Sequence, residues 1–428
     1  MVKRLITLSR SPLVRNTVYY GINFGFQIVT QFGFFVLISR ALGPSGYGVF
    51  ASVSAIALMI SVFVGLGSDH LLIQRVAVHK DQFADYFGRA LMMIGLTLLP
   101  AIPIAFVILH FLNTGELSYL GMACVIAAEC GFRKITFLAS ASYMAHDRAG
   151  RQFFIDNGSL ILRLAAVAVL TLTEGRIDIN TWALWYAGAS VLAAAVAYAM
   201  VLRDFGRPKL GLSGFDYKLG FLFSLEFASV SGLRDLDKPV IVQVLGPEHA
   251  GLYTAAFRII DAATAPVRAI LYATYTRYFR HADKGAEHGI GFGIKVLPFI
   301  SAIGVALAIF VYFVAEYIPL IIGEEYRDAV GLIKLLAFYP LLLGAAGIGA
   351  DIMRSIGMQG TRVVLILISN FAIIGFVWAG CVLGGMEGAV IARISLQAAI
   401  LAATWTIISL KRRKAVSAKD SEAPQAAE

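Results

Sequence analysis

Charged residues are scarce in this chain. Asp, Glu, Lys and Arg make up 15% of its 428 residues, whereas they make up about 25% of a soluble domain. Hydrophobic residues make up 58%, and the mean hydropathy is +0.76. A water-soluble fold has no interior large enough to bury so much apolar surface. These values exclude a soluble protein and predict an all-α protein that crosses a membrane several times.

Cysteine is also scarce. Cys124, Cys130 and Cys381 lie in apolar runs without the spacing of metal ligands, and we interpret them as small buried hydrophobic residues. We therefore expect no metal and no cofactor. The net charge of +9 would favour a nucleic-acid partner in a soluble chain. In a membrane protein the positions of the charges decide their meaning, and we expect no nucleic acid.

Membrane-spanning helices need about 20 mainly apolar residues. The sequence contains twelve candidate spans, of which the seventh is interrupted by charged residues. They cover residues 14–40, 46–68, 86–112, 119–144, 153–173, 181–203, 218–245, 251–276, 291–315, 329–353, 361–383 and 387–410.

The connections between these spans differ in charge. Those on one side hold only three basic residues among nine acidic ones, namely Arg40, Arg176 and Arg327. Those on the other side hold thirteen basic residues, namely Arg75, Lys80, Arg89, Arg148, Arg151, Arg203, Arg207, Lys209, Arg277, Arg280, Lys284, Arg354 and Arg362. Because cytoplasmic loops carry an excess of Lys and Arg, this asymmetry predicts that both termini are cytoplasmic. It also supports a multi-pass membrane protein.

A motif occurs twice, 203 residues apart. Residues 42–50 and 245–253 both read Leu-Gly-Pro, three variable residues, Gly, an aliphatic and an aromatic residue. Each copy joins two apolar runs, which predicts a tight turn and a duplicated bundle. We expect a six-helix lobe over residues 1–205, a second over 206–410 with pseudo-two-fold symmetry along the membrane normal, and a disordered basic-then-polar tail over 411–428.

Charges inside the predicted spans are candidate functional residues, because each costs several kcal/mol unless it faces a cavity or the bundle interior. After the loops and the ends of the spans are removed, nine basic residues remain at membrane depth: Arg133, Lys134, Arg163, Arg234, Lys238, Arg258, Arg268, Lys334 and Arg393. The acids at similar depth are fewer: Glu129, Glu226, Asp235, Asp237 and Asp261, with Asp156 and Asp351 near helix ends. This excess predicts a positive cavity that attracts an anion such as phosphate, which the planar guanidinium of arginine suits.

Helical spacing assigns these residues to faces. Arg258, Asp261 and Arg268 lie near one face of the eighth predicted span. In the seventh, Glu226, Arg234, Asp237 and Lys238 share one side and Asp235 points away. Equal depth pairs Asp237 with Arg258 and Arg234 with Asp261 across the two spans. The first span carries uncharged polar residues instead, including Gln27 and Gln31.

The candidate site follows from this assignment. The residues expected to bind substrate are Arg234, Arg258, Arg268, Arg133, Lys134, Gln27 and Gln31. Asp261, Asp237 and Glu226 are the candidates for a coupling ion. Two alternatives stay open. Glu129 and Arg133, four apart, also fit a pair that only stabilises its helix. Arg163, Lys334 and Arg393 also fit side chains that reach the interface or satisfy backbone carbonyls.

Two segments resemble a known family. Residues 40–75, beginning RALGPSGYGVF, and residues 321–362, ending GADIMRSIGMQGTR, resemble the polysaccharide-transport family of the multidrug/oligosaccharidyl-lipid/polysaccharide exporter superfamily. The resemblance implies an alternating-access flippase that moves an undecaprenyl-diphosphate-linked oligosaccharide from the inner to the outer leaflet for polysaccharide biosynthesis. It implies no enzymatic activity, and its implied partners are the lipid-linked oligosaccharide, membrane lipids, and a polysaccharide polymerase with export machinery. Relatives use an arginine on the first helix, where this chain has Gln27 and Gln31.

Three rival functions remain. A cation-coupled multidrug exporter of the same superfamily would need acids and aromatics in its cavity, and the excess of buried arginine argues against it. A membrane enzyme such as a polymerase or ligase would need a sizeable outer loop, and the longest one here, 316–328, is short and acidic. A non-transporting component of polysaccharide assembly fits the same sequence.

Overall fold

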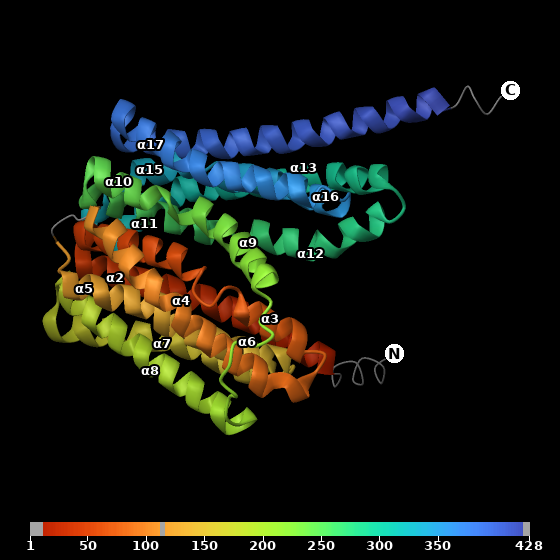
Figure 1. The fold of residues 1–428 in the computed structure, drawn as a ribbon. Coiled ribbons are helices and arrows are strands. Elements are labelled where there is room, and N and C mark those ends of the chain that lie inside the picture. Colours follow the sequence, from red (N-terminus) through yellow and green to blue (C-terminus); the bar gives the residue numbers. More distant parts are fainter. Residues whose placement is uncertain (1–11, 112–115, 423–428) are drawn as a thin grey trace, which may run out of the picture. The chain divides into compact units, whose positions relative to one another are not determined.

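The structure is a computed structural model, and it describes residues 12–111 and 116–422. Every regular element in this part of the chain is a helix (Figure 1). The chain divides into two compact units, residues 1–251 and 252–428. The predicted all-helical class is confirmed. The division falls after Gly251 because α10 (Asp237–Leu245) packs against α2 (Pro12–Ser61) in the first unit.

The first unit follows the predicted spans in order. Its helices are α2, α3 (Ser68–Val76), η1 (Lys80–Gln82), α4 (Phe83–Phe111), α5 (Tyr119–Ile126), η2 (Ala127–Phe132), α6 (Arg133–Ala145), α7 (Ala149–Glu174), α8 (Ile179–Phe205), α9 (Tyr217–Asp235) and α10. The α2, α7 and α8 helices pack in sequence, and α6 packs against α3, α7 and α8. The largest buried side chain is Trp182 of α8, which lies among Phe34, Phe50 and Tyr186.

The second unit begins within α11 (Pro247–Ala263). Its other helices are α12 (Ala265–Ala282), α13 (Ala286–Val314), η3 (Ala315–Tyr317), α14 (Ile318–Ile322), η4 (Glu324–Tyr326), α15 (Ala329–Leu336), α16 (Tyr339–Ser355) and α17 (Gln359–Glu422). Its core lies between α12, α13, α16 and α17 and contains Tyr278, Ile290, Ile300, Ile348, Ile352, Met353 and Ile408. The tail predicted to be disordered from residue 411 is helical as far as Glu422, and residues 423–428 lie outside the described residues.

Seven helical segments of the described chain are long and apolar enough to cross a membrane. Two of them, within α2 and α17, each contain two predicted spans. The predicted spans 119–144, 218–245 and 251–276 correspond to interrupted helices and are not among the seven. Large hydrophobic side chains such as Leu172 and Leu383, 87% and 86% exposed, cover the helix surfaces. The chain is therefore a multi-pass membrane protein, while twelve spans in two lobes stay a prediction.

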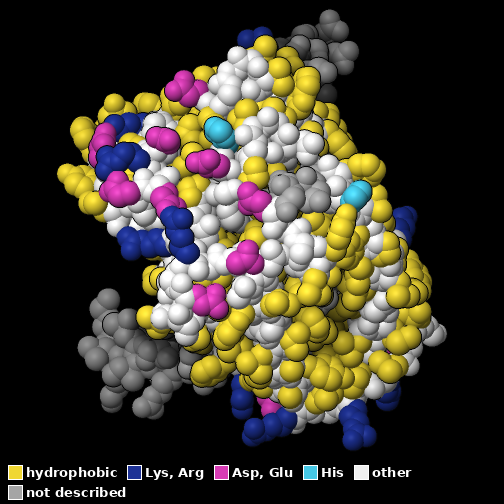
Figure 2. All heavy atoms as spheres, turned by 90° about the vertical axis from the view of Figure 1, so that its left-hand side faces the viewer, with side chains coloured by type: hydrophobic (Ala, Val, Ile, Leu, Met, Phe, Trp, Pro, Cys, Tyr) yellow, Lys and Arg dark blue, Asp and Glu magenta, His cyan; other side chains and the backbone are white. Residues whose placement is uncertain are grey.

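The helix ends that carry the predicted outer connections are rich in acidic side chains. Figure 2 looks onto these ends from the left-hand side of Figure 1, and acidic groups stand out there among hydrophobic ones. Glu316 accepts a hydrogen bond from Lys334, and Glu324 from Arg327. The side of the membrane on which these loops lie stays a prediction.

Both Leu-Gly-Pro motifs form the predicted turns. Gly43 has φ 67° and ψ 178° at the kink of α2, and Gly246 has φ 93° and ψ 169° between α10 and α11. This combination of angles is open essentially to glycine alone. Proline follows at the start of the next helix, where its missing N–H costs nothing. A Gly-Pro pair therefore produces the same bend in both copies of the motif.

The final glycines of the two motifs pack against each other's turn. A Cβ atom on Gly48 would lie 2.0 Å from the Pro247 carbonyl oxygen, and one on Gly251 would lie 1.8 Å from the Pro44 carbonyl oxygen. Gly48 corresponds to Gly251, and Pro44 to Pro247, when the motifs are aligned. The contact is thus reciprocal, as a local two-fold relation requires. This arrangement supports the predicted duplication, although the boundary at residue 205 stays a prediction.

We expect Gly48→Ala and Gly251→Ala each to destabilise the protein, because the new methyl group would overlap backbone that cannot rotate away. Forced backbone shifts of this kind cost ~1–3 kcal/mol. The double variant should cost less than the sum of the two, since Gly48 also lies against the Gly251 backbone. Thermal unfolding in detergent, followed by tryptophan fluorescence, measures the effect.

The matched control is Gly188→Ala in α8, where an added Cβ meets nothing within 4 Å. It should unfold at or above the temperature of the parent protein, because alanine is the better helix former. Unchanged unfolding of both motif variants would contradict the close backbone approach.

Candidate functional site

Two of the charge-bearing predicted spans are broken by proline. The α9 helix ends at Asp235 and α10 begins at Asp237, two residues before Pro239. The proline ring cannot donate an N–H, and it crowds the carbonyl group four residues earlier, which here belongs to Asp235. Likewise α11 ends at Ala263 and α12 begins at Ala265, immediately before Pro266. Broken helices at membrane depth are typical of binding sites in transporters.

An ion pair lies at the break between α9 and α10. Lys238 donates a hydrogen bond to the Asp235 carboxylate, and both Asp237 and Lys238 are buried. The prediction that Asp235 points away from Lys238 is therefore wrong. Asp235 and Lys238 are three residues apart, a spacing at which side chains on one helical face contact each other, and the prediction overlooked this pairing.

The break near Thr264 carries a second ion pair. Arg268 of α12 donates to the Asp261 carboxylate of α11, and the Thr264 hydroxyl donates to the Asp261 carbonyl oxygen at 2.6 Å. The predicted common face of Asp261 and Arg268 is thus confirmed. The pairs Asp237–Arg258 and Arg234–Asp261 would each join residues of different units, and they stay predictions.

The remaining predicted residues of these spans differ in burial. The Arg258 side chain is partly buried, whereas the Arg234, Glu226 and Gln31 side chains are exposed. Gln27 is partly buried and donates to the Asn23 side chain at 3.3 Å. Asn23 in turn donates to Asp156 of α7 at 3.4 Å. The polar face of the first span therefore contacts an acid of α7 rather than solvent alone.

A third interruption lies in the first unit. Residues Ala127–Phe132 form one π-helical turn between α5 and α6, a feature that is frequent at functional sites. Glu129 lies within this turn, and its side chain is 2% exposed. The predicted span 119–144 contains no proline, so this interruption has no signal of the kind that marks the breaks before Pro239 and Pro266.

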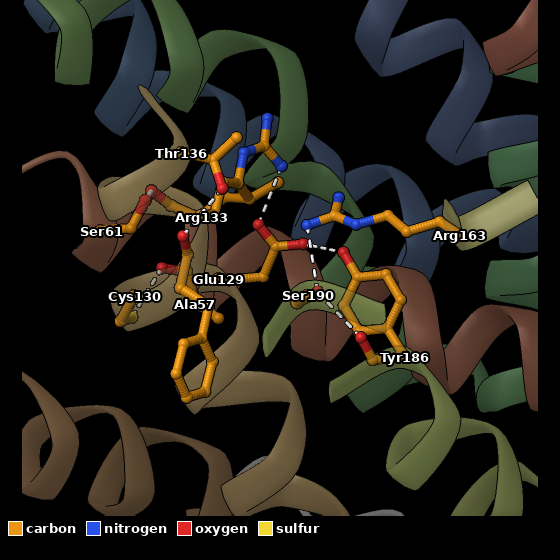
Figure 3. A network of polar contacts seen from close by, with 11 residues as sticks. Ala57, Ser61, Glu129, Cys130, Arg133, Thr136, Arg163, Tyr186 and Ser190 are labelled. Carbon is orange, nitrogen blue, oxygen red and sulfur yellow. Dashed lines mark hydrogen bonds and ion pairs between the residues drawn. The ribbon is translucent and has the colours of Figure 1, made fainter. Parts of the chain in front are cut away.

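Polar side chains from three helices surround Glu129 (Figure 3). Arg133 Nη1 donates to the Glu129 carboxylate at 2.8 Å, and the Tyr186 hydroxyl of α8 donates to its other oxygen. Arg163 of α7, 9% exposed, also attracts the carboxylate. Arg163 lies 4.6 Å from the centre of the Tyr186 ring and donates to Ser190 at 3.3 Å. We call these residues, Glu129, Arg133, Arg163, Tyr186 and Ser190, the Glu129 cluster.

The Glu129 cluster holds two guanidinium groups for one carboxylate. The pair predicted from the spacing of Glu129 and Arg133 exists, but it is one part of this larger group. Asp235 attracts Arg133 as well, and Asp69 attracts the neighbouring Lys134. Arg133 and Lys134 thus lie on the side of α6 where acids of α3 and α9 are close, which links two of the predicted sites within the first unit.

Sequence reasoning missed the aromatic partners of the buried arginines. Arg163 lies over Tyr186, and in the second unit Arg393 lies 4.8 Å from the centre of the Phe257 ring and donates to the Tyr339 hydroxyl at 3.2 Å. Neither arginine reaches an interface, because both are buried. A tyrosine in an apolar run gives no signal of its own, whereas the arginine at membrane depth does.

The candidate residues at the helix interruptions are mainly basic and acidic side chains that form ion pairs. Within residues 12–111 and 116–422 no group of three or more His, Cys, Asp or Glu side chains has the arrangement to hold a metal ion. Arginine and lysine side chains at helix interruptions bind anions through charge and hydrogen bonds. Anion binding by these residues stays a prediction.

Solved structures with the same architecture are transporters. The inward-facing structure of a multidrug resistance MATE family transporter of the MOP superfamily superposes with a TM-score of 0.71 at 15% identity, covering 93% of this chain and 99% of that one. A MOP superfamily transporter from Pyrococcus furiosus, described by the reverse polarity of its binding pocket, superposes with a TM-score of 0.60 at 14% identity, covering 93% and 95%. The fold is that of the MATE transporters of the MOP superfamily.

Sequence comparison adds the family. The sequence profile of a family described as polysaccharide biosynthesis protein matches residues 37–331, and the chain belongs to this family. A protein of Escherichia coli (strain K12), provisionally named an O-antigen transporter, is 22% identical over 358 residues, which are 81% of this chain and 84% of that protein. The chain is thus a polysaccharide-transporter-like membrane protein with a MATE-type fold.

We expect Glu129→Ala to destabilise the first unit strongly, since it leaves Arg133 and Arg163 without their carboxylate. Removing one partner of a buried ion pair costs ~3–5 kcal/mol. The control is Glu324→Ala, whose pair with Arg327 is exposed and is expected to contribute little. Unfolding in detergent compares the two, and equal losses of stability would contradict a buried, charge-compensating Glu129.

Proposed function

We propose that this protein is an alternating-access flippase of the bacterial inner membrane. It moves an undecaprenyl-diphosphate-linked oligosaccharide from the inner to the outer leaflet for polysaccharide biosynthesis. Both termini lie in the cytoplasm, and two lobes of six helices, with a boundary near residue 205, rock about the substrate. A polysaccharide polymerase and its export machinery receive the product.

The observation that carries this proposal is where the intramembrane charges lie. Three ion pairs, Glu129–Arg133, Asp235–Lys238 and Asp261–Arg268, each lie at an interruption of a helix. Helix interruptions free backbone groups and give side chains access to a cavity. Basic side chains at such points suit a diphosphate, which carries the charge and the oxygen acceptors that arginine binds best.

The roles of individual residues follow from their charge. Arg234, Arg258, Arg268, Arg133 and Lys134 are proposed to bind the diphosphate, and Gln27 and Gln31 to bind polar groups of the substrate. Asp261, Asp237 and Glu226 are the candidates for a coupling ion. Because Arg268 already neutralises Asp261, a coupling cation at Asp261 would compete with that arginine.

A multidrug exporter is the second candidate, because solved structures with this fold include multidrug transporters. Cationic drugs need acidic residues that lack a basic partner. In the described residues, Glu129, Asp235 and Asp261 all pair with a basic side chain. This pairing favours an anionic substrate over a cationic one.

The test is transport in proteoliposomes. The purified protein should move a fluorescent undecaprenyl-diphosphate oligosaccharide across the bilayer, and Arg258→Ala and Arg234→Ala should each slow the movement about 10–100-fold, the effect of losing a charged hydrogen bond. Arg327→Ala is the control, because Arg327 pairs with Glu324 on the exposed η4 turn. It should transport at the parent rate.

Two results would count against the flippase. One is full transport by both arginine variants, which would remove the anion-binding role. The other is efflux of ethidium by the parent protein with no movement of the lipid-linked sugar, which would favour the multidrug exporter.

A further inference from the structure

The Glu129 cluster contains two positively charged side chains and one negatively charged one. Its one carboxylate faces two guanidinium groups, Arg133 and Arg163. The two arginines differ in access. Arg163 is buried, and the Arg133 side chain is 32% exposed. Arg133, which Asp235 also attracts, is therefore the guanidinium of the cluster that a ligand can reach.

Arg133 is not the only side chain that stabilises the negative charge of Glu129. The Tyr186 hydroxyl donates to one of its oxygens, and Arg163 stays within electrostatic reach from α7. Arg163 itself is fixed by Ser190 and by the face of the Tyr186 ring. If Arg133 moved away, the carboxylate would keep a hydrogen-bond donor and a positive charge. Arg163 could also form a further hydrogen bond, because its Nε is buried without a hydrogen-bond partner.

Arg133 offers only part of its hydrogen-bonding capacity to Glu129. Of its three nitrogens, Nη1 makes the bond to the carboxylate, and Figure 3 shows the others directed away from it. The guanidinium carbon lies 5.3 Å from the centre of the Phe137 ring, which limits its orientation. A planar guanidinium that is bound through one nitrogen and partly exposed can still donate to an oxyanion.

We propose that Glu129 is an internal competitor for the diphosphate of the substrate, and that Arg133 exchanges Glu129 for a phosphate oxygen on binding. The inference rests on the proposed function, since it concerns how the same substrate is bound. In the resting arrangement the carboxylate occupies the arginine, as the phosphate would. When the diphosphate arrives, Arg133 turns to it, and Tyr186 and Arg163 keep Glu129 compensated.

The exchange gives the transporter a means of release. An arginine that bound the diphosphate with no competitor would hold it in both leaflets, and tight binding to both states shifts no equilibrium. A carboxylate that reclaims the arginine weakens the bound state and favours departure of the substrate. Glu129 is thus a positioning residue for Arg133 rather than a ligand of the substrate.

The test compares three variants of the Glu129 cluster. Glu129→Gln removes the competing charge and keeps the size of the side chain, so the affinity for farnesyl diphosphate should rise about tenfold. Tyr186→Phe removes the donor that holds Glu129, so the carboxylate depends more on Arg133 and the affinity should fall. Arg133→Lys keeps the positive charge but loses the planar guanidinium with its paired N–H donors, so its affinity should also fall. Isothermal titration of the full-length protein in nanodiscs measures all three.

Transport provides a second readout. In proteoliposomes Glu129→Gln should lower both KM and kcat for the lipid-linked oligosaccharide, because the substrate is bound more tightly and released more slowly. Damage to the fold alone would weaken binding in Glu129→Gln and Tyr186→Phe together. Opposite shifts in affinity therefore separate competition from instability. Glu324→Gln is the control, with no expected change in either measurement.

Equal or weaker binding by Glu129→Gln overturns the competition. Unchanged binding by Arg133→Ala shows that Arg133 is not a ligand, which ends this inference and leaves the flippase proposal in place. A parent protein that binds no farnesyl diphosphate and moves no lipid-linked sugar ends the proposed function itself.

Discussion

The hydrocarbon interior of a membrane offers no water to backbone groups or charges, so each must find its partner within the protein. The charges of this chain obey that constraint in a particular way. Glu129, Asp235 and Asp261 each accept a hydrogen bond from a basic side chain close in sequence or across a break. These three pairs lie at interruptions of the helices. The fold elsewhere is regular helix with an apolar surface.

The two glycine-dependent turns are a second constraint on the fold. Gly43 and Gly246 have backbone angles that only glycine adopts readily, and Gly48 and Gly251 leave room for the opposing backbone. A similar close approach recurs in α17, where Cβ atoms on Gly380 or Gly388 would lie 2.4 Å and 2.1 Å from the other residue's carbonyl oxygen. Helices that meet at glycine can approach closely, which is how helices associate when apolar burial provides no drive. Close packing at a few points leaves the remaining surfaces free for lipid and substrate.

Much of this architecture could be predicted from the sequence. Apolar runs of sufficient length placed the helices, and the repeated Leu-Gly-Pro placed two equivalent turns. The pair of Asp235 and Lys238 was predictable from their spacing of three residues, and Pro239 was the available signal for the break after Asp235. The π-turn at Ala127–Phe132 and the role of Tyr186 gave none, because both depend on how α6, α7 and α8 pack. Spacing along the chain identifies charged residues, whereas their partners come from tertiary packing.

The most direct test of the account is whether the protein recognises the charge of the lipid headgroup. Binding of undecaprenyl diphosphate, undecaprenyl phosphate and undecaprenol to the purified protein in nanodiscs compares ligands that share one tail. The account predicts that affinity falls from the diphosphate to the monophosphate to the alcohol, and that the difference shrinks at high salt. Equal affinity for all three would mean that only the tail is recognised, and it would contradict an anion-binding site built from these arginines.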